Sequence, residues 1–179
     1  MNHALLIFTV GILATFASAA PPYDHMKTGI SLPDTLAGLT RGDVTPYETA
    51  PGEAGVAIPY HGEEVEVTIF IRQIGPKRMT SPAMIVEESL AMVKQMEAAG
   101  TYSNVKVFKS ADKSETTGWS KAAYTARAQQ ALVISFIYAT IKGDYAIKAR
   151  ITTSNPKNDA IQKFLSEFQK IVDDAKPKP

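Results

Sequence analysis

Cysteine is absent from the 179 residues, which excludes disulfide bonds, thiolate nucleophiles and cysteine-ligated metal sites. The absence also excludes a lipid-modified cysteine, so an exported form of the chain would be released rather than tethered. Secreted eukaryotic domains of this size often carry disulfides. A cysteine-free exported domain is therefore more typical of a bacterial periplasmic or secreted protein.

Histidine is nearly absent too, because beyond residue 20 the chain contains only His25 and His61. These two do not form the i, i+4 pair of a common metal motif, and a solvated loop position explains each of them. The sequence also lacks a Gly-x-Ser-x-Gly nucleophile motif and a phosphate-binding Gly-x-x-x-x-Gly-Lys-Ser/Thr loop, and a hydroxyl nucleophile needs a positioned base. We therefore predict no catalytic, cofactor-binding or metal-binding residues, and no cofactor.

Charge is nearly balanced, with a formal net charge of +1 and no Lys, Arg, Asp or Glu among residues 1–20. Such a balance gives no general attraction to nucleic acid or to anionic lipid. We therefore expect no nucleic-acid partner. The mature chain is also expected to contain no membrane span. The expected partner is another envelope protein or a small ligand.

The N-terminus has the pattern of a cleavable signal peptide. Residues 4–16 are almost wholly apolar, and the small residues 17–20 follow, which is the arrangement that a signal peptidase recognises. The apolar stretch of about 13 residues is shorter than the ~20 that a spanning helix needs, although an N-terminal anchor or a buried helix is an alternative. The region before it has no Lys or Arg. We predict a signal peptide at 1–19, cleavage after Ala19 or Ala20, and a periplasmic or secreted protein.

The remaining chain has the length of one domain. Residues 20–54 are rich in proline and are predicted to form an extended N-terminal arm, with one edge strand at 39–47, because proline is tolerated at sheet edges. A single helical turn is expected near Leu32–Leu36. Residues 55–172 are predicted to form one α+β domain, and the polar segment 173–179 a disordered tail.

Two hairpins are predicted. The first joins strands 55–60 and 64–73 through His61-Gly62, and the second of these strands alternates between apolar and mostly polar residues. The second hairpin joins 131–142 to 145–152 through the two-residue turn Gly143-Asp144. That turn sets a register that pairs Lys142 with Tyr145, Thr140 with Ile147, Tyr138 with Ala149, Phe136 with Ile151, Ile141 with Ala146, Ala139 with Lys148, and Ile137 with Arg150.

Two helices are predicted. Ser81 and Pro82 are typical of a helix start, and Gly100 is typical of a helix end, so we expect a helix over 82–99. Asn155-Pro156 is expected to start a second, strongly amphipathic helix whose apolar residues are Ile161, Phe164, Leu165, Phe168, Ile171 and Val172. With the strands, these helices predict an antiparallel β-sheet flanked by helices on both faces, an α/β/α sandwich of the α+β class.

Two groups of side chains could carry chemistry, although each has a simpler explanation. Glu63, Glu64 and Glu66 could form a carboxylate site for acid–base work, but a solvated sheet edge explains them better, as it does Glu87 and Glu88. Thioethers can bind Cu(I), whereas methionine is more often a core filler. The methionines concerned are Met79, Met84, Met92 and Met96.

The strand over 145–152 is apolar on one face and basic on the other. Its basic residues Lys148 and Arg150 could join Lys142 in a basic strip. Such a strip is usually a solvated face.

The C-terminal half resembles the PsbP-like class of exported α/β/α sandwich domains. The resemblance covers roughly residues 55–172 and rests on Trp119 among small residues, the long apolar strand, the Gly143-Asp144 turn, the aromatic-aliphatic strand 145–152 and the final helix started by Asn-Pro. It implies a non-enzymatic accessory or partner-binding module and carries over no catalytic residue. We therefore predict an exported, non-enzymatic binding or accessory domain. The alternatives are an envelope hydrolase with a carboxylate-based site and a methionine-based metal carrier.

Overall fold

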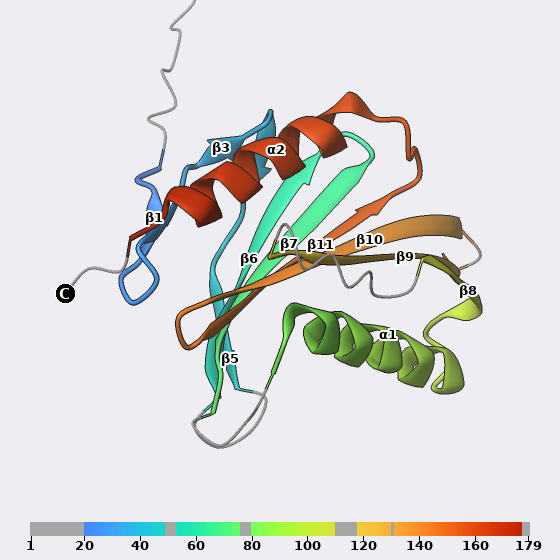
Figure 1. The fold of residues 1–179 in the computed structure, drawn as a ribbon. Helices are drawn as coiled ribbons and strands as arrows, with labels where there is room; N and C mark the ends of the chain where they lie inside the picture. Colours follow the sequence, from blue (N-terminus) through green and yellow to red (C-terminus); the bar gives the residue numbers. More distant parts are fainter. Residues whose placement is uncertain (1–19, 49–52, 76–79, 110–117, 130, 177–179) are drawn as a thin grey trace, which may run out of the picture.

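The computed structural model describes residues 20–48, 53–75, 80–109, 118–129 and 131–176 (Figure 1). The predicted signal peptide, residues 1–19, and Met79 lie outside these ranges. Eleven strands and two helices occur within them. In chain order the elements are β1 Tyr23–His25, β2 Ile30–Leu32, β3 Thr35–Leu36, β4 Leu39–Arg41, β5 Thr45–Glu48, β6 Ala54–Gly62, β7 Val65–Gln73, α1 Pro82–Ala98, β8 Ser103–Lys109, β9 Ser120–Ala128, β10 Ala131–Lys142, β11 Tyr145–Thr153 and α2 Asp159–Asp174.

One long antiparallel sheet dominates the fold. Its strand order is β3-β4-β6-β7-β11-β10-β9-β8, and β5 also pairs with β6. β1 and β2 form a small sheet of their own. The pairing of β7 with β11 joins the two predicted hairpins side by side at the centre of the sheet.

The β10–β11 hairpin confirms the predicted register in all seven pairs. The β6–β7 hairpin is confirmed as a hairpin, but its predicted turn is wrong, because His61 and Gly62 pair with Glu66 and Val65 inside the ladder. The chain reverses at Glu63 and Glu64 instead. A glycine suits the strand at position 62 because a Cβ there would lie 2.3 Å from the Leu39 side chain.

The first helix confirms its prediction, since α1 begins after Ser81, whose hydroxyl accepts a hydrogen bond from the Met84 amide. The start predicted for the second helix is wrong. Its N-cap is Asn158, whose side chain accepts from the Ala160 amide at 2.9 Å, and Asn155 forms a turn before it. The amphipathic residues of α2 are buried as predicted, with Ile171 partly so. Neither helix has the length and apolar character to cross a bilayer.

The segment before β6 forms strands that pack on the core. The helical turn predicted near 32–36 is wrong, because these residues belong to β2, β3 and the link between them, where the Tyr60 hydroxyl donates to the Pro33 carbonyl at 2.6 Å. The strand predicted over 39–47 is two strands, β4 and β5, both on β6. The apolar side chains of this segment are buried in the same core as α2: Ile30, Leu32, Leu36 and Leu39.

The predicted α/β/α sandwich is wrong. Half of the described residues lie in strands and 24% in helices. α1 packs mainly over β8, β9 and β10, whereas α2 packs over β6 and β7 together with β2 and β3 (Figure 1). Each helix covers only a part of the sheet, since α1 lies mainly over β8, β9 and β10 and α2 lies over the end of the sheet that contains β6 and β7. The protein is therefore a mostly β fold, a long antiparallel sheet with two helices.

Candidate functional site

A cavity of about 290 Å³ lies between α1 and the sheet. This volume is at the lower end of the range of small-molecule sites, ~300–1,000 Å³. Four strands and one helix contribute to its walls. The lining residues are Tyr47, Phe70, Arg72, Ile85, Glu88, Ser89, Met92, Val93, Met96, Ile137, Ala146, Lys148 and Arg150.

The position of α1 explains why there is a cavity at this place. The helix rests mainly on β8, β9 and β10 and barely reaches β11. Beyond β11, the same face of the sheet continues through β7 and β6 to β5. The cavity therefore occupies the step between the side of α1 and the part of the sheet that α1 does not cover.

Strand alternation places a mixed set of side chains in this step. On β7, Ile69 and Ile71 point into the core with α2, whereas Phe70 and Arg72 point to the α1 side. The register of β7 with β11 sets Phe70 directly opposite Lys148. The two strands thus place an aromatic ring and several cations side by side on the sheet surface that forms the floor of the cavity.

The apolar part of the wall comes from one stripe of α1 and from β5. Ile85, Met92 and Met96 recur at helical spacing and face the cavity. From the other side, the Tyr47 ring meets the Phe70 ring edge to face, with 6.0 Å between centroids. The Tyr47 ring packs directly on the sheet over Gly55, the residue that pairs with Tyr47 across the two strands. A Cβ at position 55 would lie 2.8 Å from this ring.

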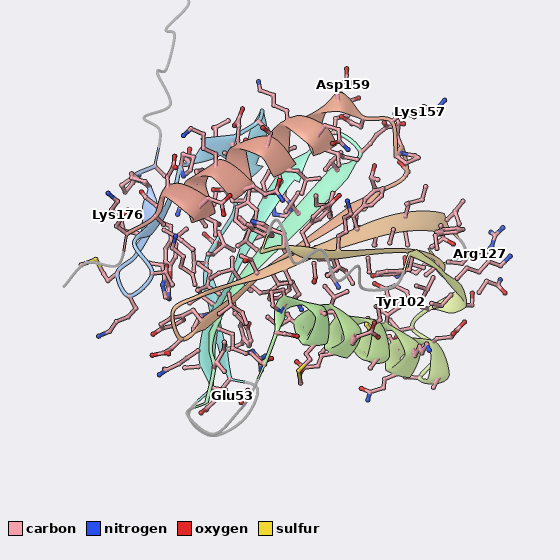
Figure 2. All side chains as sticks on the ribbon, viewed as in Figure 1. Glu53, Tyr102, Arg127, Lys157, Asp159 and Lys176 are labelled. Atoms are coloured by element: carbon pink, nitrogen blue, oxygen red, sulfur yellow. The ribbon has the colours of Figure 1, made fainter. Side chains whose placement is uncertain are left out.

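Arg72 ties the cavity wall together. Its guanidinium donates to the Glu53 carboxylate at 2.6 Å and lies 3.5 Å from a Glu88 carboxylate oxygen on α1. Glu53 is buried, and Figure 2 shows it at the β5 end of the sheet. Arg72 therefore forms a buried ion pair with Glu53 and a second, partly exposed ion pair with Glu88 on α1.

Lys148 is the most perturbed side chain of the site. Its ammonium nitrogen donates to the Ser89 hydroxyl at 3.2 Å and lies 4.4 Å from the centroid of the Phe70 ring. Burial, with the charges of Arg150 and Arg72, lowers the pKa of Lys148 from 10.5 to about 8, although Glu88 opposes this effect. Ser89 gives its own proton to the Ile85 carbonyl at 2.8 Å, which leaves its oxygen to accept from Lys148.

Two of the three cations have no acidic partner in the part of the chain that the structure describes. Among the described residues, no carboxylate oxygen lies within ion-pair distance of Lys148 or Arg150. Arg72 is the exception, because Glu53 and Glu88 both contact it. The floor of the cavity is therefore positively charged, and its remaining walls are mostly apolar.

The predicted basic strip is correct for only two of its residues. Lys148 and Arg150 lie together in the cavity, where both are partly buried. Lys142 lies at the C-terminus of α2, where its ammonium donates to the carbonyls of Val172 and Asp173 at 2.9 and 3.1 Å. This position suits a cation because the last carbonyls of a helix carry partial negative charge.

The carboxylate groups noted in the sequence separate as well. Glu63 and Glu64 form the exposed β6–β7 turn, where Asn155 donates to the Glu64 carboxylate at 3.3 Å. Six residues of extended chain, about 20 Å, divide Glu64 from Phe70 and the cavity. Glu66 is also exposed.

Glu87 is exposed as expected, but the expectation for Glu88 is wrong, since it lines the cavity and pairs with Arg72.

The histidines and methionines fall at different places. His25 lies in β1, 3.0 Å from the Thr28 hydroxyl, and His61 is exposed on β6. Met92 and Met96 line the cavity, where Met92 remains exposed, and Met84 is exposed outside the cavity lining. Within the described ranges, no three of the His, Asp and Glu residues come together in a metal-holding group.

Sequence reasoning missed Tyr47, Phe70, Arg72 and Ser89 as site residues. One local signal pointed to them, because Phe70 is the only aromatic residue on the polar side of its alternating strand. A large apolar side chain on such a face indicates something that covers it. The covering elements come from distant segments, so the sequence pattern does not identify them.

The fold and the site together define a mostly β domain with a small, positively charged cavity beside a helix. No family model matches the chain, and no curated protein matches its sequence. The resemblance to the PsbP-like class therefore stays a prediction.

Proposed function

We propose that the protein is an exported, non-enzymatic binding domain that holds a small molecule in the cavity between α1 and the sheet. The observation that carries this proposal is the cavity itself, which combines an apolar wall with a few convergent polar groups. That combination is typical of small-molecule sites. The proposal of export rests on the apolar stretch and the small residues in 1–20.

The two alternative functions gain no support from the geometry. A hydrolase built on Glu63, Glu64 and Glu66 would have its carboxylates about 13 Å or more along the β6–β7 hairpin from the cavity. A metal carrier built on Met92 and Met96 would place a metal cation in a site that also contains several positively charged side chains. Like charges repel at such short range, and the effect grows where water is excluded.

Two measurements on the protein recovered after export from its host test the proposal. The intact mass should correspond to a chain that starts at Ala20 or Pro21, and an uncleaved mass would contradict export. Binding is measured by titrating the neutral probe 1-octanol and the anionic probe octanoate while recording amide NMR shifts. We expect saturable shifts in the residues around the cavity for at least one probe, and the absence of any saturable shift would contradict the binding site.

A cavity-filling variant identifies the site. Ala146 is buried and lines the cavity, so Ala146→Leu should remove most of the space and abolish probe binding. Ala91→Leu makes the same change at an exposed position on α1 and should leave binding unchanged. Equal binding by both variants would show that the probe binds elsewhere.

A further inference from the structure

The charges of the cavity point to the kind of molecule it would accept. Among the described residues, three cations and one carboxylate line the cavity. The buried Glu53 lies next to the cavity and forms an ion pair with Arg72. Lys148 and Arg150 remain without a carboxylate among the described residues. Desolvated charges are costly unless they are paired, and a bound anion would supply the missing partner.

The apolar wall makes a second demand on the ligand. An apolar body would cover the partly buried Phe70 and the exposed Met92. Met92 and Met96 are flexible thioether side chains that adapt to a chain of variable shape. A cavity of ~150 Å³ accommodates benzene. A volume of about 290 Å³ therefore suits roughly ten to twelve non-hydrogen atoms, the size of a carboxylate on an eight- to ten-carbon chain.

The cations and the apolar side chains lie on different sides of the cavity. Lys148 and Arg150 are neighbours on the same face of β11, so their donors can converge on one headgroup. The α1 stripe of Ile85, Met92 and Met96 lies across from them. A ligand with one charged end and one apolar end would satisfy both sides, whereas a neutral apolar ligand would leave the cations unpaired.

Resting on the proposed binding function, we propose that the cavity takes an anionic amphiphile, in which one anionic headgroup lies against Lys148 and Arg150 and a short apolar chain lies against α1. The headgroup could be a carboxylate or a sulfate or phosphate ester, because all of these accept hydrogen bonds from ammonium and guanidinium groups. The chemistry that they share is a negative charge on a medium-length apolar chain.

The test compares probes of one chain length on the exported protein. Octanoate, 1-octanol and octyltrimethylammonium share an eight-carbon chain and differ in headgroup charge, and calorimetry with NMR mapping measures each affinity. Charge-assisted hydrogen bonds are among the strongest polar contacts, so octanoate should bind at least tenfold more tightly than 1-octanol, and the cation least. Octyl sulfate, compared with octanoate, distinguishes recognition of charge alone from recognition of a carboxylate.

Variants locate the headgroup. Lys148→Gln and Arg150→Gln should each reduce octanoate binding by about tenfold or more while changing 1-octanol binding little. Lys163→Gln, an exposed lysine on α2, is the matched control and should have no effect. Lys148→Met serves if the glutamine variant fails to fold, because it keeps the length of the side chain without its charge.

The outcomes separate this inference from the function on which it rests. Equal binding of octanoate and 1-octanol would overturn the anionic class and leave a cavity that binds apolar molecules. No saturable binding of any probe would overturn both proposals. Preference for octanoate that survives in both the Lys148 and the Arg150 variants would place the headgroup elsewhere and would also overturn the inference.

Discussion

The ammonium group of Lys148 lies over the ring of Phe70, 4.4 Å from its centroid, and the two residues are direct cross-strand neighbours of β11 and β7. Such a cation–π contact is worth roughly 0.5–2 kcal/mol. It does not compensate for burial, because the pKa of Lys148 falls from 10.5 to about 8. The folded protein therefore retains a charge at a cost in stability, as binding sites often do.

Replacement of Lys148 by methionine should stabilise the protein at neutral pH. Below pH 8, Lys148 is protonated in both the folded and the unfolded chain, so the cost of burying its charge is fully present. Between pH 8 and 10.5 only the folded protein loses the proton, so the contribution of Lys148 to the free energy of unfolding rises with pH. We expect Lys148→Met to gain roughly 1–3 kcal/mol at pH 7 and to lose this advantage by about pH 10.5.

Urea unfolding of wild type and variant across pH 6–10.5 measures this difference. Lys163→Met, at an exposed position on α2, is the control and should show a difference near zero at every pH. A Lys148→Met variant that is less stable than wild type at pH 7 would contradict the cost of burial.

Replacement of Glu88 by glutamine should strengthen anion binding. Glu88 lines the cavity and contacts Arg72 at 3.5 Å, and its replacement removes the one carboxylate among the described residues that line the cavity. We expect octanoate affinity to rise by roughly three- to tenfold, a limited gain because the Arg72–Glu88 ion pair is partly exposed and weak. The affinity for 1-octanol, which carries no charge, should change little. Glu87→Gln removes the same charge from the adjacent, exposed position and should change nothing. Equal effects of the two variants would indicate long-range attraction rather than a local contact.

Octanoate affinity should fall as the pH rises above about 8. Lys148 loses its proton there, while Arg72 and Arg150 keep their charge. Burial raises the pKa of Tyr47, and the Glu53 and Glu88 carboxylates, which contact Arg72, complete the charged groups around the cavity. Since anion binding favours the protonated lysine, the affinity should decline between the free and the bound pKa of Lys148.

Calorimetry from pH 6 to 9.5 tests this profile with octanoate, which stays ionised throughout. In Lys148→Gln the profile should be flat, because the titrating group is gone. A decline of the same size in that variant would assign the pH dependence to another group.

Short-range signals in the sequence predicted the local elements well. The two-residue turn Gly143-Asp144 leaves only one register for the strands on either side, and the structure contains that register. The cap at Ser81 likewise placed the start of α1. These features depend on residues a few positions apart, so one sequence suffices to read them.

The fold class and the cavity depend on contacts between distant segments. The prolines before β6 indicated an extended arm, but β4 and β5 pair with β6, and the apolar residues of β2, β3 and β4 are buried in the core that α2 covers. Phe70 and Lys148 meet only because β7 pairs with β11, and no turn connects these strands. Alternation placed Lys148 and Arg150 on one face, yet whether that face meets solvent or a helix depends on where α1 lies.

Substitution of Gly29 tests how the ends of the described chain pack together. Gly29 has φ +71°, and a Cβ on it would lie 1.9 Å from the backbone oxygen of Lys176, just after α2. Gly38 has a similar φ of +82° with no atom near the added Cβ. Both alanine variants bear the strain of positive φ, about 1–2 kcal/mol, whereas only Gly29→Ala displaces the segment after α2. We therefore expect Gly29→Ala to lower the free energy of unfolding by roughly 1–2 kcal/mol more than Gly38→Ala. Urea unfolding of both variants measures the difference, and equal losses would show that the segment after α2 contributes nothing by resting on the β1–β2 turn.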